Sequence, residues 1–153
     1  MTDDPRHRRG AGDGHPARKP AGLGPLEQDF DSGSLYALRS AVAAHAAMAG
    51  LPARLVYDVV VAAHELAANA VQHGAGRGRL RLEAAGGMLT CQVSDDGPAA
   101  ARQDQDPAAG AAPWPVGYGH GLWVIEQIAE RVTIDRGPGG TTVTAAFALP
   151  SSP

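Results

Sequence analysis

Three short polar patterns in this 153-residue chain could do chemistry, and the first lies in residues 52–73. If that segment is a helix, an advance of about 100° per residue places several polar side chains on one stripe. The stripe consists of Asp58, Glu65, Asn69 and Gln72, with His73 at its edge. Glu65 could serve as a general base and Asn69 as an oxygen ligand for Mg²⁺, which usually brings phosphates with it. The alternative is a plain solvated face, although the stripe lacks the Lys and Arg that such faces usually contain.

The second pattern is the run VSDDGP at residues 93–98, which follows a predicted strand. Two acids followed by Gly-Pro can simply form a turn. Alternatively, one carboxylate held where the strand ends accepts a hydrogen bond from the amino group of a nucleobase. The residues alone leave both interpretations open.

The third pattern is the run GYGHGL at residues 117–122, which opens an apolar helix. Glycines have no Cβ, so backbone N–H groups can approach an anion, and a helix N-terminus adds favourable partial charge. The spacing is not that of the dinucleotide fingerprint, and no Gly-Lys-Ser/Thr follows as in a Walker A loop. The run at residues 117–122 could therefore bind phosphate, or it could simply be the start of a helix.

Other reactive residue types have simpler explanations. His64 and Glu65 begin an HExxH zinc motif, but position 68 is Ala, so the motif is absent. Cys91 lies in a predicted strand, where a buried small hydrophobic residue is the usual role. We expect Trp123 to pack in the core.

These patterns must be positioned by an α+β domain whose elements follow from hydrophobic periodicity and turn residues. The expected helices span residues 35–49, 52–73 and 122–130, and the expected strands span 26–31, 79–83, 88–94, 132–135 and 141–149. Ser34 is the expected N-cap of the first helix, and Gly50 is expected to end it. Gly86-Gly87 predicts a hairpin turn. The sum is a mostly antiparallel sheet with helices on one face.

Composition excludes several classes of protein. A hydrophobic fraction of 44% can form a real core despite 20 Gly and 12 Pro, and the length suits one domain. A net charge of −3 gives no basic surface for nucleic acid or a membrane, and a single cysteine excludes a disulfide framework and favours the cytoplasm. We expect residues 1–25 to form a disordered tail, 26–150 the domain, and about 98–116 a binding loop.

Taken in order, the polar patterns resemble the four boxes of the GHKL ATP-binding superfamily, which includes gyrase, the heat-shock chaperone, histidine kinases and MutL. The boxes are Glu65-x-x-x-Asn69-x-x-x-His73, Asp95-x-Gly97, Gly117-x-Gly119-x-Gly121-Leu122 and Gly140-Thr141-Thr142. The resemblance covers about residues 26–150. The segment 65–73, with the helix before it, looks most like anti-sigma-factor serine kinases of the RsbW/SpoIIAB type.

The resemblance implies a Bergerat fold, a two-layer sandwich of a mostly antiparallel mixed sheet with helices on one face. It implies that Asn69 coordinates Mg²⁺ between the phosphates of ATP, and that Glu65 takes a proton from a substrate serine. Asp95 would accept the adenine amino group, Gly97 would give the base room, and Thr142 would lie near Asp95. The remaining cofactor-binding residues would be His73, Gly117, Gly119, His120, Gly121 and Leu122, with residues 98–116 as the ATP lid.

The implied function is that of an anti-sigma factor with ATP-dependent serine kinase activity. Its partners would be a sigma factor and a serine-bearing anti-anti-sigma protein, without nucleic acid or membrane, and homodimer formation is a further expectation. Two alternatives are a non-catalytic, ATP-dependent partner-switching binder and a stand-alone histidine-kinase-like ATPase domain. The chain departs from the family pattern at Ala99, where a Gly is usual, and Arg102 is the only basic residue of the expected lid.

Overall fold

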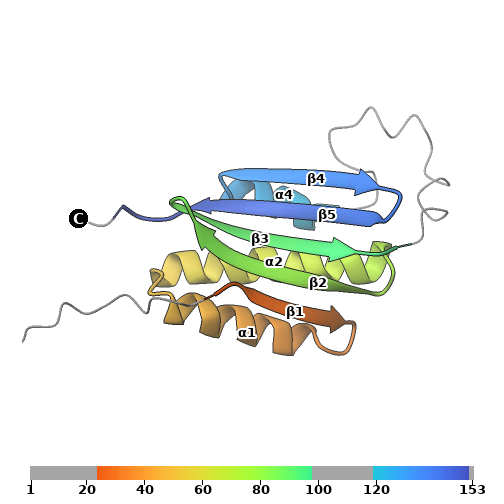
Figure 1. Cartoon of the computed structure of the whole chain (residues 1–153), viewed down its shortest axis with the longest axis horizontal. Helices are drawn as coiled ribbons and strands as arrows, with labels where there is room; N and C mark the ends of the chain where they lie inside the picture. Colours follow the sequence, from red (N-terminus) through yellow and green to blue (C-terminus); the bar gives the residue numbers. More distant parts are fainter. Residues whose placement is uncertain (1–23, 98–118, 152–153) are drawn as a thin grey trace, which may run out of the picture.

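A computed structural model describes residues 24–97 and 119–151, without the side chains of Gly119 and His120. The expected lid and Gly117 lie outside the described residues, as does nearly all of the expected tail. In chain order the elements are β1 (Leu26–Asp31), α1 (Leu35–Met48), α2 (Ala53–His73), β2 (Arg77–Ala85), β3 (Met88–Asp95), α4 (Gly119–Ile128), β4 (Arg131–Gly137) and β5 (Gly140–Ala148) (Figure 1).

The described strands form one five-stranded sheet in the order β1-β2-β3-β5-β4. All four pairings are antiparallel, so the sheet is more regular than the mixed sheet expected from the resemblance. The β2–β3 hairpin turns at Gly86 and Gly87, whose φ values of 60° and 77° suit the turn that matches strand twist. The predicted hairpin is therefore confirmed.

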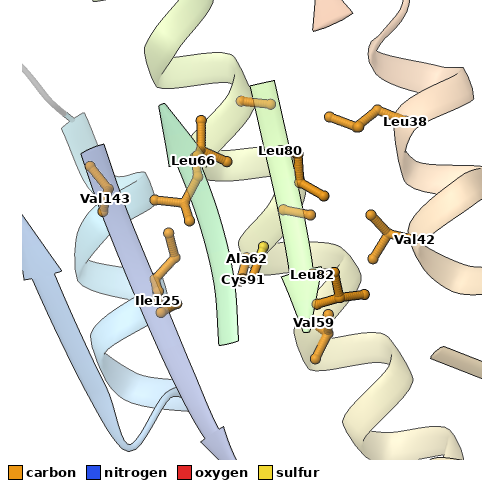
Figure 2. Packing of buried hydrophobic residues seen from close by; sticks show 14 of the residues in the cluster. Leu38, Val42, Val59, Ala62, Leu66, Leu80, Leu82, Cys91, Ile125 and Val143 are labelled. Carbon is orange, nitrogen blue, oxygen red and sulfur yellow. The ribbon is translucent and has the colours of Figure 1, made fainter. Parts of the chain in front are cut away.

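The described helices pack against one face of the sheet, as expected (Figure 1). Buried and half-buried residues alternate along β3 and β5, because successive side chains point to opposite faces. The buried set meets helix residues such as Leu38, Val59 and Ile125 in a single core (Figure 2). This two-layer arrangement confirms the predicted fold class.

The α1–α2 turn follows the sequence prediction in backbone detail. Gly50 has φ 78° and donates its N–H to Ala47, while Leu51 donates to Ala46. This pair of bonds satisfies the last carbonyls of α1 in the Schellman pattern. Ser34 is the residue before α1, but its hydroxyl accepts a hydrogen bond from Asp31 N (2.9 Å) and does not cap the helix.

The helix α4 differs most from its prediction. It begins at Gly119, three residues before the expected Leu122, and it ends at Ile128. Leu122 and Ile125 are buried, so the intervening Trp123 points away from the core and is 61% exposed. The expected core position of Trp123 is therefore wrong.

Candidate functional site

The expected site segments converge at one end of the molecule. The C-terminal end of α2, the end of β3 and the start of β5 meet there, on the right of Figure 1. Side chains from these three elements line a small cavity: Leu66, Asn69 and Ala70 from α2, Val93 and Asp95 from β3, and Thr141 and Val143 from β5. Helical spacing in α2 and strand pairing thus bring Asn69 and Asp95 together across 26 positions of sequence.

Asn69 is buried in this cavity and does not lie on a solvated face. Its side chain is 8% exposed, and its amide nitrogen has no hydrogen-bond partner among the described residues. A buried polar group without a partner costs about 1–3 kcal/mol. The cavity therefore suits a ligand or a water molecule that pairs with this amide.

Asp95 is held rigidly where β3 ends. Its carboxylate Oδ1 accepts a hydrogen bond from Gly97 N at 2.7 Å, and the side chain is 7% exposed. A Cβ at Gly74 would lie 2.7 Å from Oδ2 of this carboxylate, and a Cβ at Gly140 would overlap the Asp95 carbonyl oxygen. Nothing in the local sequence around Gly74 indicates this contact with Asp95.

The cavity contains Thr141 where the resemblance implied Thr142. The β3–β5 register pairs Asp95 with Thr141, which is 4% exposed. Thr142 pairs with Ser94 on the opposite face of the sheet, where their hydroxyls lie 3.2 Å apart. Because strand side chains alternate, a shift of one residue changes which threonine shares a face with the carboxylate.

Glu65 lies beside the first turn of α4. Its carboxylate packs so closely on Gly121 that any Cβ at that position would overlap Glu65 Oε2. Leu122 is buried and anchors α4 in the core, while Gly119 opens the helix. The half-buried acid thus stands next to a helix start, where backbone N–H groups favour anions.

The remaining expected site residues are less enclosed. His73 is the last residue of α2 and its side chain is exposed, whereas Gly97 is buried beside Asp95. Cys91 is fully buried on the core side of β3, and burial raises the pKa of its thiol to about 12. A chemical role for this cysteine is not supported.

The described residues offer no dedicated metal cage. No group of three or more His, Cys, Asp and Glu side chains gathers among residues 24–97 and 119–151. Mg²⁺ usually takes only one or two protein oxygens together with substrate phosphates. Asn69 could supply one such oxygen from its buried amide group, while the unpartnered amide nitrogen could donate to a phosphate oxygen or a water molecule. Within the described part, no helix combines the length and apolarity needed to cross a membrane.

Two solved structures are similar to this chain. A structure of the RsbU and RsbW domains of a Mycobacterium tuberculosis protein is 23% identical with TM-score 0.57, covering 82% of this chain and 32% of that one. A histidine kinase domain from the Erythrobacter litoralis blue-light activated histidine kinase is 19% identical with TM-score 0.48, covering 76% and 60%.

The chain thus spans about a third of the first structure and less than two thirds of the second. A search of curated proteins found no match. Residues 30–147, most of the chain, match the family model described as the histidine kinase-like ATPase domain. The superfamily predicted from the four boxes is therefore confirmed, and the chain belongs to the histidine kinase-like ATPase domain family.

Proposed function

We propose that this chain is a cytoplasmic, Mg-ATP-binding anti-sigma factor that phosphorylates a serine of an anti-anti-sigma protein. The observation that carries the proposal is the buried Asn69 amide, with an unpartnered nitrogen, in a cavity shared with Asp95. Membership of an ATPase domain family indicates which ligand such a cavity would take. The resemblance of residues 65–73 to RsbW/SpoIIAB-type kinases indicates the reaction and the partners.

ATP would lie with its adenine against the β3–β5 end of the cavity. Asp95 is a buried carboxylate that could accept the adenine amino group, and the Thr141 hydroxyl lies on the same face. The close packing of Gly74 and the hydrogen bond from Gly97 N hold this carboxylate in place, so little ordering is needed on binding. Bound Mg²⁺ would neutralise phosphate charge, with Asn69 as its protein ligand.

Glu65 would act as the general base in phosphoryl transfer. The serine oxygen would attack the terminal phosphorus of ATP, ADP would leave, and Glu65 would take the hydroxyl proton. Its carboxylate is held at the first turn of α4, four residues before Asn69 on α2. Glu65 and the groups proposed to bind the phosphates would therefore be neighbours.

Labelled ATP offered with a serine-bearing anti-anti-sigma protein tests the proposal. We expect wild type to form an acid-stable phosphoserine on the partner, and Glu65→Gln to lose transfer by about 100-fold or more while still binding ATP. Glu126→Gln is a matched control, because Glu126 is exposed on α4 away from the cavity. Asn69→Ala should lose nucleotide binding together with transfer.

The other outcomes distinguish the alternatives. ATP binding without transfer by wild type would contradict the kinase and indicate a partner-switching binder. Arg102 as the only basic residue of 98–116 favours that second candidate, because few cations would reach the terminal phosphate. An acid-labile phosphohistidine product would instead indicate a histidine-kinase-like domain.

A further inference from the structure

Gly121 is a glycine that its own backbone conformation does not require. It is the third residue of α4, and its φ lies outside the left-handed region, unlike the φ of 144° at Gly140. Alanine is the better helix former at such a position. The local backbone therefore gives no reason for a glycine at position 121.

The space beside Gly121 is occupied by the side chain of Glu65. A Cβ at position 121 would overlap Glu65 Oε2, and it would lie 3.3 Å from Cδ and 3.5 Å from Cβ of the same residue. The three nearest atoms thus all belong to this one side chain, which comes from α2. A methyl group on residue 121 would push the carboxylate aside, whereas the hydrogen of glycine lets it rest against the first turn of α4.

No polar contact within the described part of the chain fixes this carboxylate. The Glu65 side chain makes no hydrogen bond or ion pair with any residue in 24–97 or 119–151. Asp95 differs, because its carboxylate accepts a hydrogen bond from Gly97 N. A long side chain without a polar partner has several rotamers open to it. The contact with Gly121 therefore limits where the Glu65 carboxylate can lie.

We infer that Gly121 is a positioning residue, which holds the Glu65 carboxylate where it takes the proton of the substrate serine. The inference rests on the proposed function, in which Glu65 is the general base. Such a base must come within about 2.6–3.2 Å of the oxygen that gives up the proton, and a displacement of about 1 Å can cost about 100-fold in rate. The resemblance implies another role for Gly121, contact of its backbone with the phosphates. Alanine keeps the backbone N–H, so the two roles can be separated.

Kinetics of Gly121→Ala with labelled ATP and the serine-bearing partner test the inference. We expect kcat to fall about 10- to 100-fold, because the methyl group displaces the base, while the Kd for ATP changes by less than about twofold. In a Glu65→Gln background the same substitution should not change kcat further, because no base remains to be displaced. Gly139→Ala is the matched control, because its methyl group would meet no atom within 4 Å, and it should keep the wild-type kcat.

Carboxyl ¹³C NMR of the nucleotide-free full chain gives a second measurement, which does not depend on activity. The Glu65 signal is assigned by its absence from Glu65→Gln. We expect this signal to shift in Gly121→Ala and to stay in place in Gly139→Ala. The melting temperature of Gly121→Ala should remain within about 4 °C of wild type, because the obstructing atoms are the end of a side chain that can rotate.

Two results would overturn the inference. An unmoved Glu65 signal in Gly121→Ala would show that Gly121 does not hold the carboxylate. Weaker ATP binding with an unchanged kcat would show that the glycine serves the phosphates alone. Absence of phosphoserine with wild type would contradict the proposed kinase instead, and the NMR signal would still show whether Gly121 holds the carboxylate of Glu65.

Discussion

Gly140 illustrates how closely the backbone packs around Asp95. Its φ of 144° lies where side chains are strained, and a Cβ would overlap the Asp95 carbonyl oxygen. The obstructing oxygen belongs to the backbone of Asp95, which is paired with Thr141 of β5, so it cannot move without shifting β3. The glycine is therefore required both by its dihedral angle and by its neighbour.

We expect Gly140→Ala to lower the free energy of unfolding by about 2 kcal/mol or more. Gly139→Ala is the control, because a Cβ there meets no atom within 4 Å, and its effect should stay within about 0.5 kcal/mol. Urea denaturation of the three proteins measures both changes. Equal stability of the two variants would contradict the packing at Asp95.

Asn69 and Thr141 show what individual residues reveal before the fold is known. Helical periodicity is enough to place Glu65 and Asn69 on one side of α2, one turn apart. The burial of Asn69 depends on β3 and β5, which pack beside it from 24 to 74 positions later. The motif at residues 140–142 contains both Thr141 and Thr142. Only the β3–β5 register determines that Thr141 shares a face with Asp95.

The helices differ in how far local sequence determines them. Gly50 ends α1 by local backbone hydrogen bonds alone, so a sequence signal predicts it well. The early start of α4 is the opposite case, since Gly119 and Gly121 are poor helix formers. Burial of Leu122 and Ile125 outweighs that propensity, and such packing cannot be read from a window of sequence.

His45 on α1 is a half-buried histidine that makes the stability of the fold depend on pH. Burial lowers the pKa of His45, because the half-buried imidazole loses solvation that its charged form needs. Near the unfolded pKa of about 6.5 the unfolded chain thus binds more protons than the folded one, so stability decreases as the pH falls. Above that pH the group is neutral in both states and has no such effect.

We expect His45→Gln to reduce the loss of stability between about pH 7.5 and pH 5.5, because glutamine does not titrate. Urea denaturation of wild type and variant at the two pH values measures the difference. An identical loss in the two proteins would show that burial of His45 does not contribute to the pH dependence.

The molecule as a whole places its site where the two layers meet at one end. The cavity is lined by α2 from the helical layer and by β3 and β5 from the sheet. A ligand in this cavity therefore contacts elements that separate when the domain unfolds. Binding should be coupled to global stability, because the unfolded chain has no such cavity.

Mg-ATP should consequently raise the melting temperature of the full chain. When free Mg-ATP is present at about 100 times its Kd, binding stabilises the folded state by about 2.7 kcal/mol. This corresponds to an increase in melting temperature of about 5–11 °C for a domain of this size. Asp95→Asn should lose most of this increase, because its buried carboxylate would face the adenine. Asp96→Asn should keep it, because that neighbouring carboxylate is exposed and does not line the cavity. Equal increases in both variants would show that Asp95 does not contact the nucleotide, and no increase in wild type would contradict ATP binding itself.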